Sequence, residues 1–167
     1  NEIADLSEST GPSWVTPAYN RAGNMTTIPK PADPTQTFTG SYDAWNRLVK
    51  LEDGSGTVAQ YEYDGAKRRM IKREYNSGVF SRTLHFYCTE PGQWQVVEQR
   101  VDSGTTANQQ FVWDLRYIDN LVLRDCDTNG NGALDQRLYA LQDANWNVTA
   151  LIDTSGVRQR FGYSSYG

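Results

Sequence analysis

The sequence lacks a long hydrophobic run: no stretch of its 167 residues reaches the roughly 18 consecutive apolar residues of a membrane-spanning helix. It also lacks an excess of positive charge, because 16 Lys and Arg against 20 Asp and Glu give a formal net charge of −4. One basic cluster lies at residues 67–73, but a nucleic-acid interface needs a sustained basic face. The sequence therefore predicts no membrane span and no nucleic-acid partner.

Residues that commonly carry catalysis are scarce. His85 is the only histidine, and on a strand it points to the opposite face from Cys88, three residues later. No phosphate-binding glycine loop, HExxH or CxxC motif is present. Cys88 and Cys126 form a disulfide only if their strands are neighbours, and we expect unbridged thiols instead. No catalytic residue is assigned.

What the sequence does contain is a repeated phrase. It reads YNRAGNMTTI from Tyr19, YDAWNRLVKL from Tyr42 and YDGAKRRMIK from Tyr63. A spacing of about 20 residues is typical of stacked supersecondary units. Asn or Asp after the tyrosine can accept a hydrogen bond from a backbone N–H two residues on, and this favours a turn. The predicted turns are Asn20–Gly23, Asp43–Asn46 and Asp64–Lys67.

Lys67 departs from the pattern of these turns. Gly23 and Asn46 occupy a position where a positive φ costs little, whereas a lysine rarely adopts one. The third turn must therefore differ from the others or carry strain.

The rest of the chain favours strands. Residues 81–89, 93–101 and 109–125 alternate polar and apolar side chains, and no stretch shows the 3.6-residue period of a helix. Prolines at 29, 31 and 34 predict an extended connector at an edge or end of the sheet. The predicted fold is all-β, built of antiparallel hairpin repeats in an extended twisted sheet. We expect an irregular segment with one repeat over residues 1–40 and a repeat-sheet domain over 41–167.

The three phrases resemble the YDxxGR motif of the YD-repeat, or Rhs, family. The tail LYALQDANWNVTALIDTSGVRQRFGYSSYG resembles the start of the Rhs-associated core, with Asp143 and Asn147 at matching places and Trp146 where the family has glycine. The resemblance implies part of a β-sheet shell that encloses a variable C-terminal polypeptide, often a toxin, in a bacterial secreted or cell-surface protein. It also implies a fragment that ends where that core begins.

Two functions are compatible with these features. The first is a structural repeat module, a scaffold segment whose partners are the remainder of a larger parent polypeptide and, through edge-strand pairing, a second copy of the chain. The alternative is a small hydrolase acting on a glycoside or an ester, with a cleft lined by carboxylates and aromatic side chains. A pocket that collects carboxyl groups with perturbed pKa values would favour the hydrolase. Its carboxylates could come from Asp43, Asp64, Glu90, Glu98, Asp102, Asp114 and Asp119.

One segment, DTNGNGALDQRL from Asp127, has the oxygen-ligand spacing of a calcium loop, with a glycine at the sixth position. Leu138 stands at position 12, where a bidentate glutamate belongs, so weak affinity is expected. The alternative is a plain Asn-Gly turn. The predicted calcium ligands are Asp127, Asn129, Asn131, Ala133 and Asp135.

Overall fold

The computed structural model describes residues 11, 13–90, 93–117 and 120–163, and in this part of the chain every regular element is a β-strand. The all-β prediction is confirmed. The described residues contain no helix of the length and apolar character needed to cross a membrane. The strands are β1 (Ala18–Tyr19), β2 (Met25–Pro29), β3 (Thr37–Tyr42), β4 (Leu48–Asp53), β5 (Gly56–Tyr63), β6 (Arg69–Asn76), β7 (Val79–Cys88), β8 (Val96–Val101), β9 (Gln109–Trp113), β10 (Leu121–Cys126), β11 (Gln136–Gln142), β12 (Val148–Asp153) and β13 (Gly156–Arg160).

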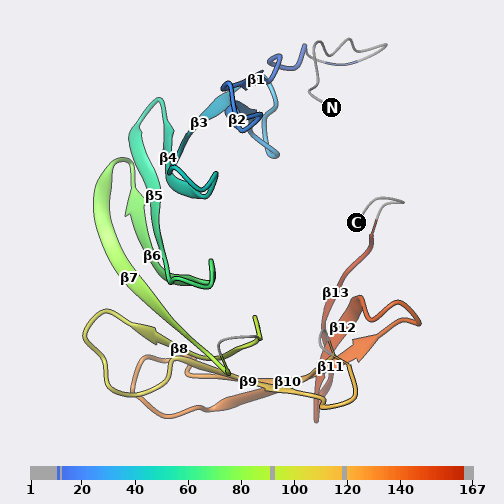
Figure 1. The fold of residues 1–167 in the computed structure, drawn as a ribbon. Helices are drawn as coiled ribbons and strands as arrows, with labels where there is room; N and C mark the ends of the chain where they lie inside the picture. The colour runs from blue at the N-terminus through green and yellow to red at the C-terminus, as the bar shows by residue number, and fades with distance from the viewer. Residues whose placement is uncertain (1–10, 12, 91–92, 118–119, 164–167) are drawn as a thin grey trace. The chain divides into compact units, whose positions relative to one another are not determined.

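The strands pair in sequence order, each with the strand before it and the strand after it (Figure 1). Contacts divide the chain into two compact units, residues 1–83 and 84–167. The first unit holds β1 to β6 and the start of β7, and the second holds the end of β7 and the remaining strands. The predicted division between residues 40 and 41 falls within β3.

Each repeat phrase contains a β-bulge at its tyrosine. The register of the pairing shifts just before Tyr19, Tyr42 and Tyr63, and these residues face Met25, Leu48 and Arg69 on the following strand. A bulge bends the strand and re-aims its side chains. It therefore sets the direction of the chain as it enters each turn.

The proline-rich segment, predicted to be an extended connector, is partly strand. Pro29 is the last residue of β2 and faces Thr37 of β3, so the residues from Thr37 onward belong to a strand. Residues 30–36 join two adjacent antiparallel strands, and Lys30 N–H donates to the Gln36 carbonyl at 2.9 Å. The connection is therefore a hairpin loop. The two prolines within it, at 31 and 34, supply no N–H to a ladder, which favours a loop over a strand there.

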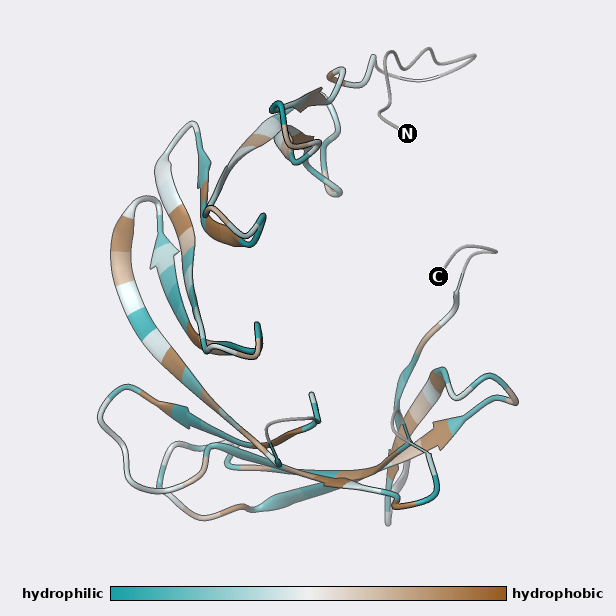
Figure 2. Ribbon diagram, viewed as in Figure 1, coloured by the Kyte–Doolittle hydropathy of each residue, from teal (hydrophilic) through white to brown (hydrophobic). Residues whose placement is uncertain are grey.

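Few side chains are fully buried. The largest buried group lies in the second unit, where Leu138, Ala150 and Leu151 on β11 and β12 are 4–5% exposed. Most strand residues are half-buried, and apolar and polar bands alternate along β7 (Figure 2). His85 of β7 is a half-buried strand residue opposite Arg100, and the two cysteines are not joined in a disulfide. Within the described residues, the fully buried apolar core is therefore small.

Candidate functional site

The turn at Asp43 shows how the repeat uses its aspartate. The Asp43 Oδ1 atom accepts hydrogen bonds from the backbone N–H groups of Trp45 (2.9 Å) and Arg47 (3.0 Å). Its Oδ2 atom accepts from Arg47 Nε at 2.6 Å. Reduced hydration alone raises the pKa of this carboxyl, but the hydrogen bonds from Arg47 hold its pKa below the ordinary value. The carboxylate thus replaces backbone acceptors inside the turn.

The same arrangement recurs at the other predicted turns. Asp64 Oδ1 accepts from Ala66 N–H and Arg68 N–H, each at 2.9 Å, and Asp64 Oδ2 accepts from Arg68 Nε at 2.7 Å. Asn20 makes the two backbone bonds through its amide oxygen, at 2.9 and 3.0 Å. Asp143, within the tail segment from Leu138, makes them at 2.8 and 3.1 Å. The predicted turns are confirmed, and none lies in a helix.

Four equivalent turn positions have a positive φ. The values are 80° for Gly23, 61° for Asn46, 67° for Lys67 and 65° for Trp146. The turn keeps its shape at Lys67 and Trp146, although both side chains are unfavourable in the left-handed region. Of the two outcomes predicted for the third turn, strain is the one observed.

A further repeat turn, at Asp114, was not predicted from the sequence. Asp114 follows Trp113 at the end of β9, and its Oδ1 atom accepts the backbone N–H of Arg116 at 2.9 Å. Asp114 N–H donates to the Asn120 carbonyl at 2.8 Å, which closes the turn as in the shorter copies. The sequence signal is the dipeptide Trp-Asp in place of Tyr-Asp, followed by a connection two residues longer.

In the first unit, the aromatic side chains of two repeats link each of them to the repeat before it. The hydroxyl of Tyr42 donates to the Met25 carbonyl, and the hydroxyl of Tyr63 donates to the Leu48 carbonyl, both at 2.8 Å. Each acceptor is the first strand residue after the preceding turn. Burial raises the pKa of both phenols, so they remain protonated donors at neutral pH.

The second unit makes the same link. Tyr163 Oη donates to the Val148 carbonyl and Trp113 Nε1 donates to the Val96 carbonyl, each at 2.8 Å. Tryptophan therefore performs the role of the repeat tyrosine at β9. We call these four contacts the cross-repeat hydrogen bonds.

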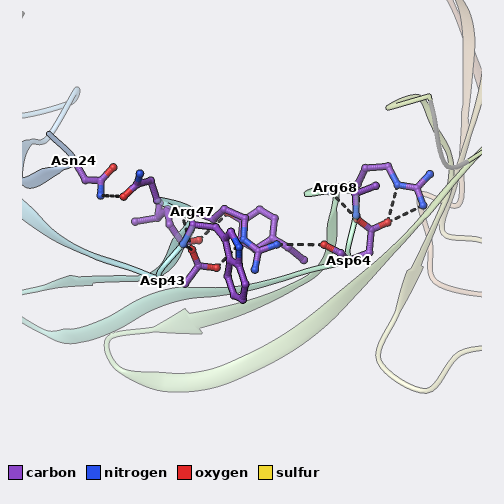
Figure 3. Close-up of polar contacts among 10 residues, drawn as sticks. Asn24, Asp43, Arg47, Asp64 and Arg68 are labelled. Atoms are coloured by element: carbon purple, nitrogen blue, oxygen red, sulfur yellow. Dashed lines mark hydrogen bonds and ion pairs between the residues drawn. The ribbon is translucent and has the colours of Figure 1, made fainter. Parts of the chain in front are cut away.

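In the first unit the turns also contact one another directly. Asn24 Nδ2 donates to Asn46 Oδ1 at 2.9 Å, and Arg47 Nη1 donates to the Asp64 carbonyl at 3.2 Å (Figure 3). The Arg47 guanidinium lies 4.9 Å from the Tyr63 ring centroid, within the range of a cation–π interaction. Three successive turns are therefore connected along one edge of the sheet.

Residues 42–78 match the family model described as RHS Repeat. This segment is an RHS repeat. It contains the turns at Asp43 and Asp64 and the strands β4 to β6, and the match supports the predicted resemblance to the Rhs or YD-repeat family over these residues. No curated protein matches the sequence. The geometry above is thus the local structure of an RHS repeat, and the turns at Asn20, Asp114 and Asp143 extend it beyond the matched segment.

The carboxylates considered for hydrolysis belong to different turns, strands and connections. Asp43, Asp64 and Asp114 each belong to a different repeat turn, and Glu98 on β8 pairs with Arg100. Glu90 and Asp102 lie in connections between strands, and Asp119 lies outside the described residues.

Three pockets lined by described residues each contain one carboxyl group with a shifted pKa: Asp64, Glu74 and Asp114. Each pKa is lowered. The Glu74 shift comes first from Lys72, the Asp114 shift from Arg116, and hydrogen bonds from Arg68 lower Asp64 against its reduced hydration. A general acid needs a raised pKa. These carboxylates are arranged as hydrogen-bond acceptors.

The predicted calcium ligands lie in one loop between β10 and β11. Asp127 accepts backbone N–H groups from Gly130 and Gly132, each at 2.7 Å, and Asp135 accepts Thr128 N–H at 2.8 Å. Asn129 Nδ2 donates to Asp135 Oδ2 at 2.7 Å. The N–H of Gly132 is the main cause of the lowered pKa of Asp127, and that of Thr128 is the main cause for Asp135.

The other two predicted ligands are in the same loop: Asn131 accepts Ala133 N–H at 2.8 Å. The described residues contain no group of three or more His, Cys, Asp or Glu side chains arranged to hold a metal ion. The geometry is that of a hydrogen-bonded turn, and calcium binding stays a prediction.

Calcium binding predicts a specific thermal response. A ligand that binds only the folded state raises the melting temperature, so millimolar calcium should stabilise the chain relative to chelator. Asp127→Ala combined with Asp135→Ala should remove that shift. Differential scanning calorimetry in calcium and in chelator measures it, with magnesium as the matched divalent control. Identical melting temperatures in all three buffers would contradict calcium binding and indicate that the loop is only a turn.

Proposed function

We propose that the chain is a scaffold segment, in which RHS repeats join into a continuous β-ribbon within a larger polypeptide. The observation that carries this proposal is the recurrence of the cross-repeat hydrogen bonds. They link Tyr42 to Met25, Tyr63 to Leu48, Trp113 to Val96 and Tyr163 to Val148. An interaction that recurs in several repeats serves the assembly of repeats rather than one reaction centre.

Contacts at the opposite ends of the hairpins support the same function. Lys30, from the loop between β2 and β3, pairs with Asp53, the last residue of β4, at 2.8 Å. A Cβ atom added at Gly56 would lie 3.1 Å from the Cα atom of Gly78, so the turn after β4 packs closely against the turn after β6. Adjacent hairpins of the first unit are thus fixed at both ends.

The proposed assembly can be tested with a single hydroxyl group. Tyr63→Phe keeps the ring and its contact with Arg47 but removes the donor to the Leu48 carbonyl. We expect the free energy of unfolding to fall by about 1 kcal/mol, the usual net value of one such hydrogen bond. Denaturant titration followed by circular dichroism measures the change.

Tyr61→Phe is the matched control. Tyr61 lies on the same strand, and its ring sits 5.6 Å from the Arg69 guanidinium, a contact that phenylalanine keeps. The described residues give its hydroxyl no hydrogen-bond partner, so a change within about 0.5 kcal/mol is expected. Equal losses in the two variants would contradict a specific role for the Tyr63 hydroxyl. A bacterial secreted or surface parent protein, an enclosed polypeptide and self-association through strand edges stay predictions.

A further inference from the structure

The loop between β10 and β11 contains the chain's two Asn-Gly dipeptides, Asn129–Gly130 and Asn131–Gly132. In such a dipeptide the side-chain amide carbon lies within reach of the next backbone nitrogen, and glycine has no Cβ atom to hinder the approach. Both asparagines are exposed to solvent. The loop therefore holds two candidate sites for deamidation, a reaction within the chain whose only co-reactant is water.

The two attacking nitrogens have equivalent hydrogen bonds. Gly130 N–H donates to Asp127 Oδ1 and Gly132 N–H donates to Asp127 Oδ2, each at 2.7 Å. One carboxylate thus accepts hydrogen bonds from both of the N–H groups that must lose a proton, and it gives neither nitrogen an advantage. A difference in reactivity between the two dipeptides must therefore come from the asparagine amides.

The two side-chain amides are held differently. Asn129 is fixed at both polar atoms, because its Oδ1 accepts the Asn131 N–H at 3.0 Å and its Nδ2 donates to Asp135 Oδ2 at 2.7 Å. Asn131 Oδ1 accepts the Ala133 N–H at 2.8 Å, but no described residue accepts a hydrogen bond from Asn131 Nδ2. Only at Asn129, therefore, must a hydrogen bond to a carboxylate break before the amide nitrogen leaves.

The hydrogen bond that Asn131 does make favours the reaction. Attack on the amide carbon places negative charge on Oδ1, and the Ala133 N–H already donates to this atom before the charge develops. A donor that is in position beforehand stabilises such charge without reorganisation. Asn131 thus combines a supported amide oxygen with an amide nitrogen that no described residue holds.

We propose that Asn131 is a site of self-deamidation. The Gly132 nitrogen forms a bond with Asn131 Cγ, the Cγ–Nδ2 bond breaks, and the proton of the Gly132 N–H leaves with Nδ2 as ammonia. Water then opens the succinimide at either of its carbonyls and produces aspartate or isoaspartate at position 131. Either product adds a negative charge to a loop that already contains Asp127 and Asp135. The loop becomes more acidic as the chain ages, and scaffold assembly does not depend on this change.

The test is tryptic peptide mapping of the chain after storage, intact and folded, in chelator at neutral pH. Cleavage after Arg124 and Arg137 gives one peptide that contains both asparagines, and its fragment masses assign the conversion to either residue. We expect Asn131 to be converted about tenfold faster than Asn129, the factor that corresponds to one hydrogen bond to a charged group. Equal rates, faster conversion of Asn129, or an Asn131 as stable as Asn145, which no glycine follows, would overturn the proposal.

Storage in urea shows whether the folded loop causes the difference. The unfolded chain lacks the hydrogen bonds of the loop, while both dipeptides keep their glycine. The two asparagines should then be converted at similar rates. A preference for Asn131 of the same size in urea would contradict a structural cause.

Asp135→Asn tests the hydrogen bond that protects Asn129. It replaces the Oδ2 acceptor by an amide nitrogen, which cannot accept from Asn129 Nδ2, and keeps an oxygen for the Thr128 N–H. Conversion of Asn129 should rise about tenfold, towards the rate of Asn131. An unchanged rate at Asn129 would contradict the proposed basis of the selectivity.

Discussion

Replacing Gly78 by alanine is expected to lower the free energy of unfolding by about 3 kcal/mol. Gly78 has a φ of 78°, a left-handed conformation that costs an alanine about 1–2 kcal/mol. Its new Cβ atom would also lie 2.8 Å from the Ser55 carbonyl oxygen, a backbone atom that cannot turn aside. Forcing such a contact apart costs about 1–3 kcal/mol. Urea denaturation of the variant measures the sum.

Alanine substitutions at a matched pair of glycines separate the cost of backbone strain from the cost of steric crowding. Gly156 has a φ of 125° and open space around its Cβ position, whereas Gly56 has a φ of 119° and a Cβ position 3.1 Å from the Gly78 Cα atom. Gly156→Ala therefore carries the backbone strain alone, and Gly56→Ala carries strain and the contact with the neighbouring turn. Gly56→Ala should be the more destabilising. Equal losses would mean that the two turns do not support one another.

Replacing Asp64 by alanine should also lower stability markedly, because three partners lose their acceptor at once. The Ala66 N–H, the Arg68 N–H and the Arg68 guanidinium all donate to this carboxylate. Asp64→Asn is the matched control, since Asn20 shows that an amide oxygen accepts both backbone bonds. Thermal unfolding should rank the chains as wild type, Asp64→Asn and then Asp64→Ala. An alanine variant as stable as wild type would show that the turn does not need its side chain.

The pH dependence of these variants follows from the lowered pKa of Asp64. Its ordinary value is 3.8, and hydrogen bonds from Arg68 lower it in the folded chain against the effect of reduced hydration. The carboxylate therefore contributes stability fully above pH 3.8, and this contribution is lost as the pH falls through the lower folded value. Unfolding curves from pH 7 to pH 2 should converge for wild type and Asp64→Asn at the acid end. A constant difference across this range would contradict the assignment.

The repeat turns and the strands could be predicted from the sequence because they depend on interactions between residues close in the chain. An Asp or Asn side chain reaches an N–H only two residues away, so the turns at Asn20, Asp43 and Asp64 could be located without tertiary information. Period-two alternation likewise predicted the strands. The turn at Asp114 was missed because Trp113 replaces the tyrosine and the connection is longer, although the Trp-Asp dipeptide marked it.

Contacts between repeats were not predictable in the same way. The tyrosine spacing indicated matching positions, but the acceptors of Tyr42 and Tyr63 are carbonyls 17 and 15 residues earlier in the chain, brought close by the stacking of hairpins. A pocket lined by Trp45 of one turn and Lys67 of the next likewise depends on this stacking. At Lys67, the preference of lysine for a negative φ left two possibilities, a different turn or a strained one. The hydrogen bonds around the turn maintain the strained conformation.

Hydrogen exchange of the intact chain tests the coupling between repeats most directly. If the Tyr63 hydroxyl joins two repeats, Tyr63→Phe should lower amide protection on both sides of the bond, in β3 and β4 as well as in β5 and β6. The reduction in opening free energy should be similar on both sides, about 1 kcal/mol, because one hydrogen bond is lost to a shared unit. Protection that falls only in β5 and β6, or that does not fall beyond the Tyr61→Phe control, would contradict the account.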